Sequence, residues 1–87
     1  MSDVENARQK LAMCVQNLDS IGGYLSLAIQ ELEGVKAMAM DAAEGASGAA
    51  SVQDVTGMVG RAEEDCETAR QAVFAARNGA EEVANRL

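Results

Sequence analysis

Apolar and small residues recur at alternating steps of three and four along most of the chain, and this periodicity constrains the fold more than any other feature. The first series consists of Val4, Ala7, Leu11, Cys14, Leu18, Ile21, Leu25, Ala28, Leu32, Val35, Ala39 and Ala42. The second consists of Val52, Val55, Val59, Ala62, Cys66, Ala69, Val73, Ala76, Ala80, Val83 and Leu87. A mean spacing of 3.5 residues is the repeat of helices in a left-handed coiled coil. The pattern predicts an all-α protein with two long helices.

The ends of these helices carry their own signals. Ser2 with Glu5, and Ser51 with Asp54, have the spacing of a capping box at a helix N-terminus. Gly45 follows the first series, where the residue after a helix is often glycine. The expected elements are a helix over about 2–43, a loop over about 44–51 and a helix over about 52–87, in one domain spanning 1–87.

The two series match each other when the second helix runs antiparallel to the first. Pairing residues whose numbers add up to 94 places Leu25 opposite Ala69 and Ile21 opposite Val73. Each leucine of the first series then faces alanine or valine, and large side chains against small ones pack closely. We therefore predict an antiparallel two-helix hairpin, with Cys14 and Cys66 as buried thiols too far apart to form a disulfide.

Two adjacent glycines, Gly22 and Gly23, interrupt the first series without shifting its register. Glycine in a helix interior costs about 1 kcal/mol relative to alanine. We expect the helix to continue through the pair. Gly22 lies between Val15 and Ile29 at heptad spacing, so it either permits a gentle bend or forms a notch for another helix.

The composition argues against catalysis and nucleic-acid binding. The chain has no histidine, and the acidic run Glu63–Glu67 would place only Cys66 inward, so we expect no catalytic, metal or cofactor site. The net charge is −7, whereas nucleic-acid binding requires a basic stripe.

The first ten residues contain no apolar signal region and no run is long enough to span a membrane. Free thiols indicate a reducing compartment, so we expect a cytoplasmic protein, with secretion by a non-Sec route as the alternative.

A core this rich in alanine is small for 87 residues, which favours association. Five apolar residues lie off the seam on one flank, and methionine suits adaptable interfaces. We expect this flank to bind a second copy, giving a four-helix bundle, or a helical partner protein. The predicted interface residues are Met13, Tyr24, Leu27, Met38 and Met58.

Two other functions are alternatives. An acidic protein can mimic nucleic acid and inhibit a DNA-binding protein, although here Arg and Lys are interspersed with the acidic residues. The tripeptide Asp19-Ser20-Ile21 resembles the Asp-Ser-Leu motif of acyl carrier proteins, whose serine carries phosphopantetheine at the start of a helix.

By its size and hairpin pattern, the whole chain also resembles the WXG100 (ESAT-6-like) family of small helical proteins of type VII secretion. The turn reads "GASGAA" where that family has Trp-Xaa-Gly, and the C-terminal Tyr-x-x-x-Asp/Glu signal is absent. The resemblance implies a hairpin that acts by pairing with the helices of a partner.

Overall fold

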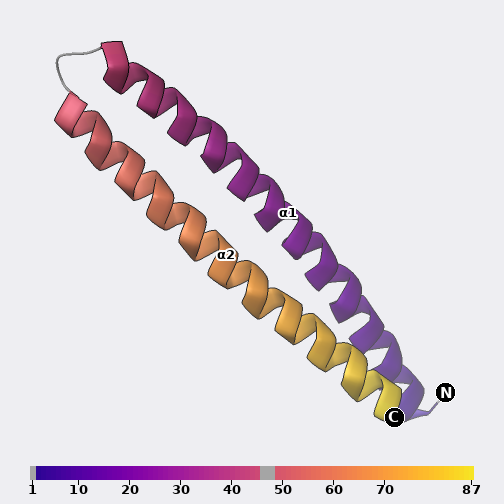
Figure 1. Ribbon diagram of the computed structural model, residues 1–87. Helices are drawn as coiled ribbons and strands as arrows, with labels where there is room; N and C mark the ends of the chain where they lie inside the picture. The colour runs from indigo at the N-terminus through magenta and orange to yellow at the C-terminus, as the bar shows by residue number, and fades with distance from the viewer. Residues whose placement is uncertain (1, 46–48) are drawn as a thin grey trace.

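The computed structural model describes residues 2–45 and 49–87, which form two long helices lying side by side (Figure 1). Helix α1 spans Asp3–Gly45 and α2 spans Ala49–Arg86. The two ends of the chain lie together at one end of a rod whose Cα atoms extend over 68 × 14 × 12 Å. The predicted all-α antiparallel hairpin is confirmed, whereas assembly into a four-helix bundle stays a prediction.

The predicted caps are correct at one helix start and wrong at the other. The backbone N–H of Glu5 donates a hydrogen bond to Ser2 Oγ over 3.1 Å, as a capping serine requires. Helix α2 begins at Ala49, two residues before Ser51, so Ser51 lies inside the helix rather than capping it. Gly45 is the last residue of α1, and no glycine in the described ranges has the positive φ of a C-terminal cap. Both helices thus extend into the predicted 44–51 loop, of which residues 46–48 lie outside the described residues.

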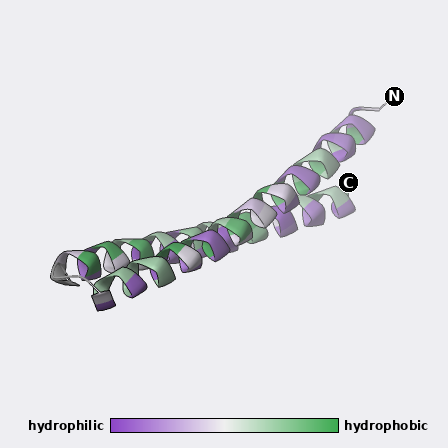
Figure 2. Cartoon of the chain, turned by 90° about the horizontal axis from the view of Figure 1, so that it is seen from above, coloured by the Kyte–Doolittle hydropathy of each residue, from purple (hydrophilic) through white to green (hydrophobic). Residues whose placement is uncertain are grey.

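Helix α1 continues through Gly22 and Gly23 without a break, as predicted. Figure 2 shows the two helices curving together along the rod. A smooth curve of this kind is common in long helices and needs no local distortion. A Cβ atom built on either glycine would meet nothing within 4 Å, so neither is required by a close approach of α2.

The seam between the helices is rotated relative to the predicted one. One predicted line of α1 is confirmed from residue 11 onward, because its members there are half-buried: Leu11, Leu18, Leu25, Leu32 and Ala39. Val4, the first member of that line, is exposed. On the second predicted line Ala7 and Ala28 are half-buried as predicted, but the assignment to the seam is wrong for the exposed residues Cys14, Ile21, Val35 and Ala42. The neighbouring line takes its place and is half-buried at Val15, Gly22, Ile29, Lys36 and Ala43. Gly22, predicted to lie off the seam, is therefore part of it.

Helix α2 is rotated in the same sense. Val55, Ala76 and Val83 were predicted to face α1, but each is exposed, whereas Thr56 and Arg77 are half-buried. The physical reason lies in α1, where apolar residues occupy three adjacent heptad lines, and one neighbouring helix covers only two of them. The chosen pair of lines covers the large side chains Val15 and Ile29 of α1 and leaves Cys14, Ile21, Val35 and Ala42 of the third line exposed.

Among residues 2–45 and 51–87 none is buried, so this part of the hairpin has a contact seam but no closed core. The leucines of the seam are only half-buried. The predicted burial of both thiols is wrong for Cys14, which is exposed, while Cys66 is half-buried. Two helices alone cannot enclose a side chain on all sides, because each seam residue still borders the open grooves along the hairpin.

Candidate interaction surface

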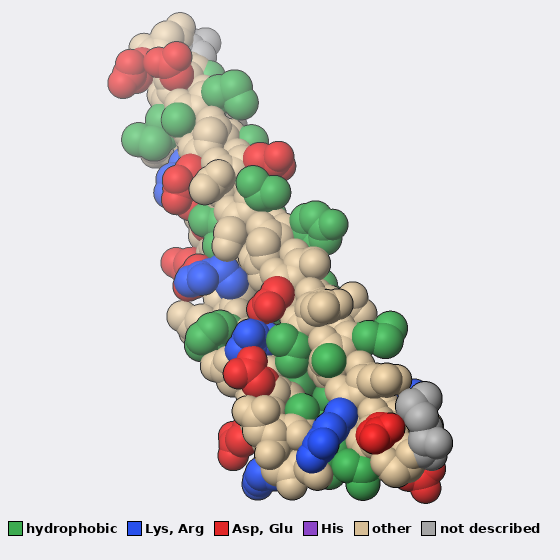
Figure 3. Space-filling model, turned by 90° about the vertical axis from the view of Figure 1, so that its right-hand side faces the viewer, with side chains coloured by type: hydrophobic (Ala, Val, Ile, Leu, Met, Phe, Trp, Pro, Cys, Tyr) green, Lys and Arg blue, Asp and Glu red, His purple; other side chains and the backbone are tan. Residues whose placement is uncertain are grey.

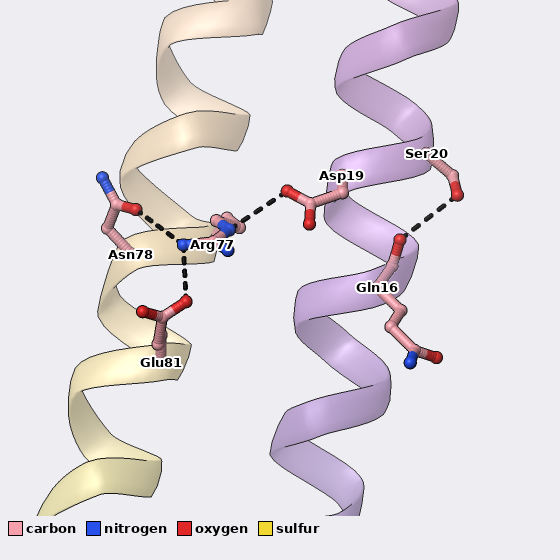
Figure 4. Close-up of polar contacts among 6 residues, drawn as sticks. All are labelled: Gln16, Asp19, Ser20, Arg77, Asn78 and Glu81. Atoms are coloured by element: carbon pink, nitrogen blue, oxygen red, sulfur yellow. Dashed lines mark hydrogen bonds and ion pairs between the residues drawn. The ribbon is translucent and has the colours of Figure 1, made fainter.

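One long side of the hairpin carries the ion pairs between the helices. Arg77 Nε donates to Asp19 Oδ1 over 3.0 Å, and its Nη1 atom lies 2.6 Å from Glu81 Oε2 on the next turn (Figure 4). Arg77 Nη1 also donates to Asn78 Oδ1 over 3.3 Å. Arg77 thus connects α1 to α2 and pairs with two carboxylates, one on each helix.

A second interhelical ion pair lies nearer the loop. Lys36 Nζ is 2.9 Å from Glu63 Oε1, an atom that is shielded from solvent and accepts no hydrogen bond. The lysine charge therefore compensates the partial desolvation of that carboxylate. Within α2, Arg70 forms a two-armed pair with Glu67, over 3.0 and 2.6 Å. The hydrogen bond from Arg70 lowers the pKa of the Glu67 carboxyl below its ordinary value of 4.5.

The same side contains the shallow hollows of the surface. One hollow of about 150 Å³ is lined by residues of both helices: Leu18, Asp19, Gly22, Gly23, Ser26, Arg70, Val73, Phe74 and Arg77. Another, near the loop, is lined by Met40, Ala43, Glu44, Gln53 and Thr56. The ion pairs and these hollows define the ion-paired flank of the hairpin. Its polar side chains interact within the chain and leave little unsatisfied for a ligand.

The opposite side, the apolar flank, follows from the helix period. Leu18 and Leu25 lie on the seam, and Gly22 between them faces the ion-paired flank. Ile21 lies on the other side of the leucine line, because residues three and four positions away fall on opposite sides of a given residue. The flank comprises the lines of Ile21 and Tyr24 on α1 and the corresponding lines on α2. Its large exposed members are Ile21, Tyr24, Val35, Met38, Val55, Met58 and Val83, with exposed fractions between 41% and 70%.

All five residues predicted from the sequence to form an interface are exposed. Tyr24, Met38 and Met58 belong to the apolar flank, with exposed fractions of 70%, 67% and 59%. Met13 and Leu27 lie one line further round α1, away from α2, with exposed fractions of 61% and 56%. In the space-filling view, hydrophobic side chains protrude at intervals along the rod (Figure 3).

Sequence reasoning missed part of this surface. Ile21, Val35, Val55 and Val83 were assigned to the seam, yet each is more than 40% exposed. The signal that could have revealed them is the presence of Val15 and Ile29 beside the leucine line. Apolar residues on three heptad lines are typical of a helix that contacts two neighbours in a bundle.

Other candidate sites take their place in this geometry. Ser20, of the carrier-like motif, lies in the interior of α1, where its hydroxyl donates to the Gln16 carbonyl over 3.2 Å (Figure 4). Among residues 2–45 and 49–87 there is no group of three metal-ligating side chains. Over the same residues, neither helix combines the length and apolar character needed to cross a membrane.

Comparisons of the chain with protein families, with curated proteins and with solved structures found no match.

Proposed function

We propose that this protein is a non-enzymatic helical module for protein–protein interaction, which associates with itself or with a helical partner protein. One observation supports this best: no residue whose burial the structure describes is buried, while seven large apolar side chains are exposed along one flank. Exposed apolar side chains are normal when they are scattered, but a contiguous stripe marks an interaction site.

The energetics of a two-helix hairpin point the same way. Small domains rarely obtain enough stability from a single core, and they add disulfides, metals or association. Cys14 and Cys66 are free, and the chain has no histidine. Association would bury the apolar flank and supply the missing contacts, as helix pairing does in four-helix bundles.

The cellular setting is part of the proposal. Free cysteines fit a reducing compartment, so we propose a cytoplasmic accessory or chaperone-like role. The hairpin is compatible with the small helical proteins of the WXG100 family, which makes a secretion-associated role the alternative.

A pair of methionines on opposite flanks tests the proposal. Met38 lies on the apolar flank and Met40 lines a hollow of the ion-paired flank, with exposed fractions of 67% and 57%. Met38→Glu should weaken association by roughly tenfold or more, because a carboxylate would be desolvated in the interface. Met40→Glu, which adds the same charge, should leave association unchanged.

Sedimentation velocity over a concentration series measures the association of each variant, and the helicity of the same samples shows whether each variant is folded. A wild-type chain that is monomeric and fully helical at micromolar concentration would rule out self-association. Binding of a helical partner that is equally sensitive to both substitutions would rule out the apolar flank as the interface.

A further inference from the structure

We infer that the apolar flank is covered by a second copy of this chain, docked antiparallel, with a two-fold axis passing close to Ile21. This inference rests on the proposed function, and it adds the partner and its orientation. It follows from the positions of the few charges on the apolar flank.

Five charged residues lie on the Tyr24 and Met58 lines of the apolar flank: Asp3, Lys10, Glu31, Asp65 and Arg86. Lys10 and Glu31 are fourteen residues before and seven after Tyr24, and therefore share its line on α1. Asp65 and Arg86 are seven and twenty-eight residues after Met58, and share its line on α2. Lys10, Glu31 and Asp65 form no ion pair within the described chain, and Arg86 approaches only Glu82, at 3.9 Å.

The register of the hairpin groups four of these charges into two pairs and leaves Asp3 beyond the end of α2. The two interhelical ion pairs join residues whose numbers add up to 96 (Asp19 and Arg77) and 99 (Lys36 and Glu63), so residues whose numbers add up to about 96 to 99 lie at roughly the same level along the rod. Lys10 is then level with Arg86, and Glu31 is level with Asp65. The flank carries a basic pair toward the end where the chain termini lie and an acidic pair roughly 30 Å away, at 1.5 Å per residue.

Only one of the two symmetric face-to-face dimers suits this pattern. If the hairpins run parallel, the basic pair of one copy meets the basic pair of the other, and the acidic pairs also meet. If they run antiparallel, with α1 on α1 and α2 on α2, Lys10 meets the partner's Glu31 and Asp65 meets the partner's Arg86. Opposite charges in contact favour a complex, and like charges oppose it.

The same charges fix the position of the two-fold axis. The midpoint between Lys10 and Glu31 falls between residues 20 and 21, next to Ile21, whose exposed fraction is 43%. Ile21 would then pack against its own symmetry mate, and Cys14 would lie opposite the partner's Ala28. Both pairs are apolar or small, so the axis fits the side chains as well as the charges.

The flank is also large enough for a stable interface. The rod is 68 Å long and 14 Å wide between Cα atoms. With the axis between residues 20 and 21, residues 3–38 of α1 lie opposite the partner's α1 and residues 64–87 of α2 lie opposite the partner's α2, so the overlap covers most of α1 and the C-terminal part of α2 and leaves Val55 and Met58 beyond it. A face of this size approaches the ~800 Å² that each partner buries in a standard protein complex.

Cysteine crosslinking locates the axis directly. In the full chain with Cys14→Ala and Cys66→Ala, Ile21→Cys should form an intermolecular disulfide within the dimer under mild oxidation. Val35→Cys is the matched control, since it lies on the same heptad line with a nearly equal exposed fraction of 41%. In the antiparallel dimer the two copies of residue 35 lie roughly 40 Å apart, too far for a disulfide. Equal crosslinking at both positions, or crosslinking at position 35 alone, would overturn the inference.

Charge reversal tests the orientation. Lys10→Glu should weaken the antiparallel dimer by roughly tenfold, and adding Glu31→Lys should restore it. Arg8→Glu is the control, because it makes the same change in charge two residues away, off the Lys10 line. In a parallel dimer Lys10→Glu would instead strengthen association, because the reversed side chain would face the partner's Arg86.

The outcomes separate the inference from the proposed function. A dimer that strengthens with Lys10→Glu is not antiparallel, yet it still shows association through the apolar flank. A wild-type chain that stays monomeric at all accessible concentrations overturns the homodimer and leaves the heterologous partner as the proposed function.

Discussion

The two flanks of the hairpin are formed by the same two helices but carry different side chains. On the ion-paired flank, Asp19, Lys36, Glu63 and Arg77 form ion pairs that bridge the helices. On the apolar flank, Ile21, Val35 and Val55 are exposed and interact with nothing beyond the seam. One flank is satisfied within the chain, and the other is not.

This difference between the flanks determines which of them would gain free energy if a partner covered it. Ion pairs already engage the charged groups Asp19, Lys36, Glu63 and Arg77 of the ion-paired flank, so covering it would desolvate them further at a cost. Covering the apolar flank would release water from apolar surface, worth about 25 cal/mol per Å². If the protein associates as proposed, the apolar flank is therefore the expected contact.

The largest expected contrast uses the two aromatic residues, since one lies on each flank. Tyr24, on the apolar flank, is 70% exposed, and Phe74, which lines the hollow beside Arg77, is 65% exposed. Tyr24→Ala should weaken association by about 2 kcal/mol or more, because buried tyrosines often dominate interface energies. Phe74→Ala should change it by less than about 0.5 kcal/mol. Sedimentation equilibrium gives the dissociation constant of each variant. A larger loss of association with Phe74→Ala than with Tyr24→Ala would mean that the ion-paired flank is the interface.

A smaller effect, a gain in folding stability rather than a loss of association, is expected at a glycine that lines the hollow of the ion-paired flank. Gly22→Ala should raise the free energy of unfolding by about 0.5–1 kcal/mol, because alanine is the better helix former and its Cβ meets nothing within 4 Å. Gly34→Ala, at an exposed and equally open position, should give a similar gain. Thermal and urea unfolding measure both. A Gly22→Ala chain that folds well but associates poorly would mean that the hollow receives a partner after all.

The smallest effect concerns pH. Arg70 lowers the pKa of Glu67 in the folded chain, so the ionised carboxylate favours folding. This contribution is fully present above the unfolded pKa, near 4.5, and is lost as the pH falls through the lower folded value. The difference in unfolding free energy between wild type and Glu67→Gln should therefore shrink as the pH falls below about 4.5. Glu64→Gln, measured in parallel, reports the effect of removing one exposed negative charge from the same helix. Association should be unaffected by either substitution, and a dimer lost with Glu67→Gln would contradict the division between flanks.

The sequence was sufficient for the architecture because helix periodicity is a local property. The leucine line of α1, the continuity through Gly22 and Gly23 and the cap at Ser2 all follow from spacing and propensity within a few residues. The choice between neighbouring lines at Ile21 and Gly22 does not. It depends on how α2 rotates to cover Val15 and Ile29 and to pair Lys36 with Glu63, and single-helix patterns do not contain that information.

For the same reason, only some of the exposed residues of the apolar flank were predicted. The exposure of Tyr24, Met38 and Met58 was predicted from the sequence because they are apolar and off the predicted seam, and their role in an interface stays a prediction. The exposure of Ile21 and Val35 was not predicted, because the 3.5-residue repeat fits them equally well inside the hairpin. An expected seam that holds more apolar lines than one neighbour can cover is itself the sign of a further helix.

The absence of a buried side chain among residues 2–45 and 51–87 has a consequence for how the chain would behave in a cell. If folding draws its stability from a second copy, the folded fraction follows mass action, and dilution acts as a denaturant. Newly made chains would remain open to proteases until their number is sufficient for pairing. The level of expression would then set how long each molecule survives, so that abundance and lifetime rise together.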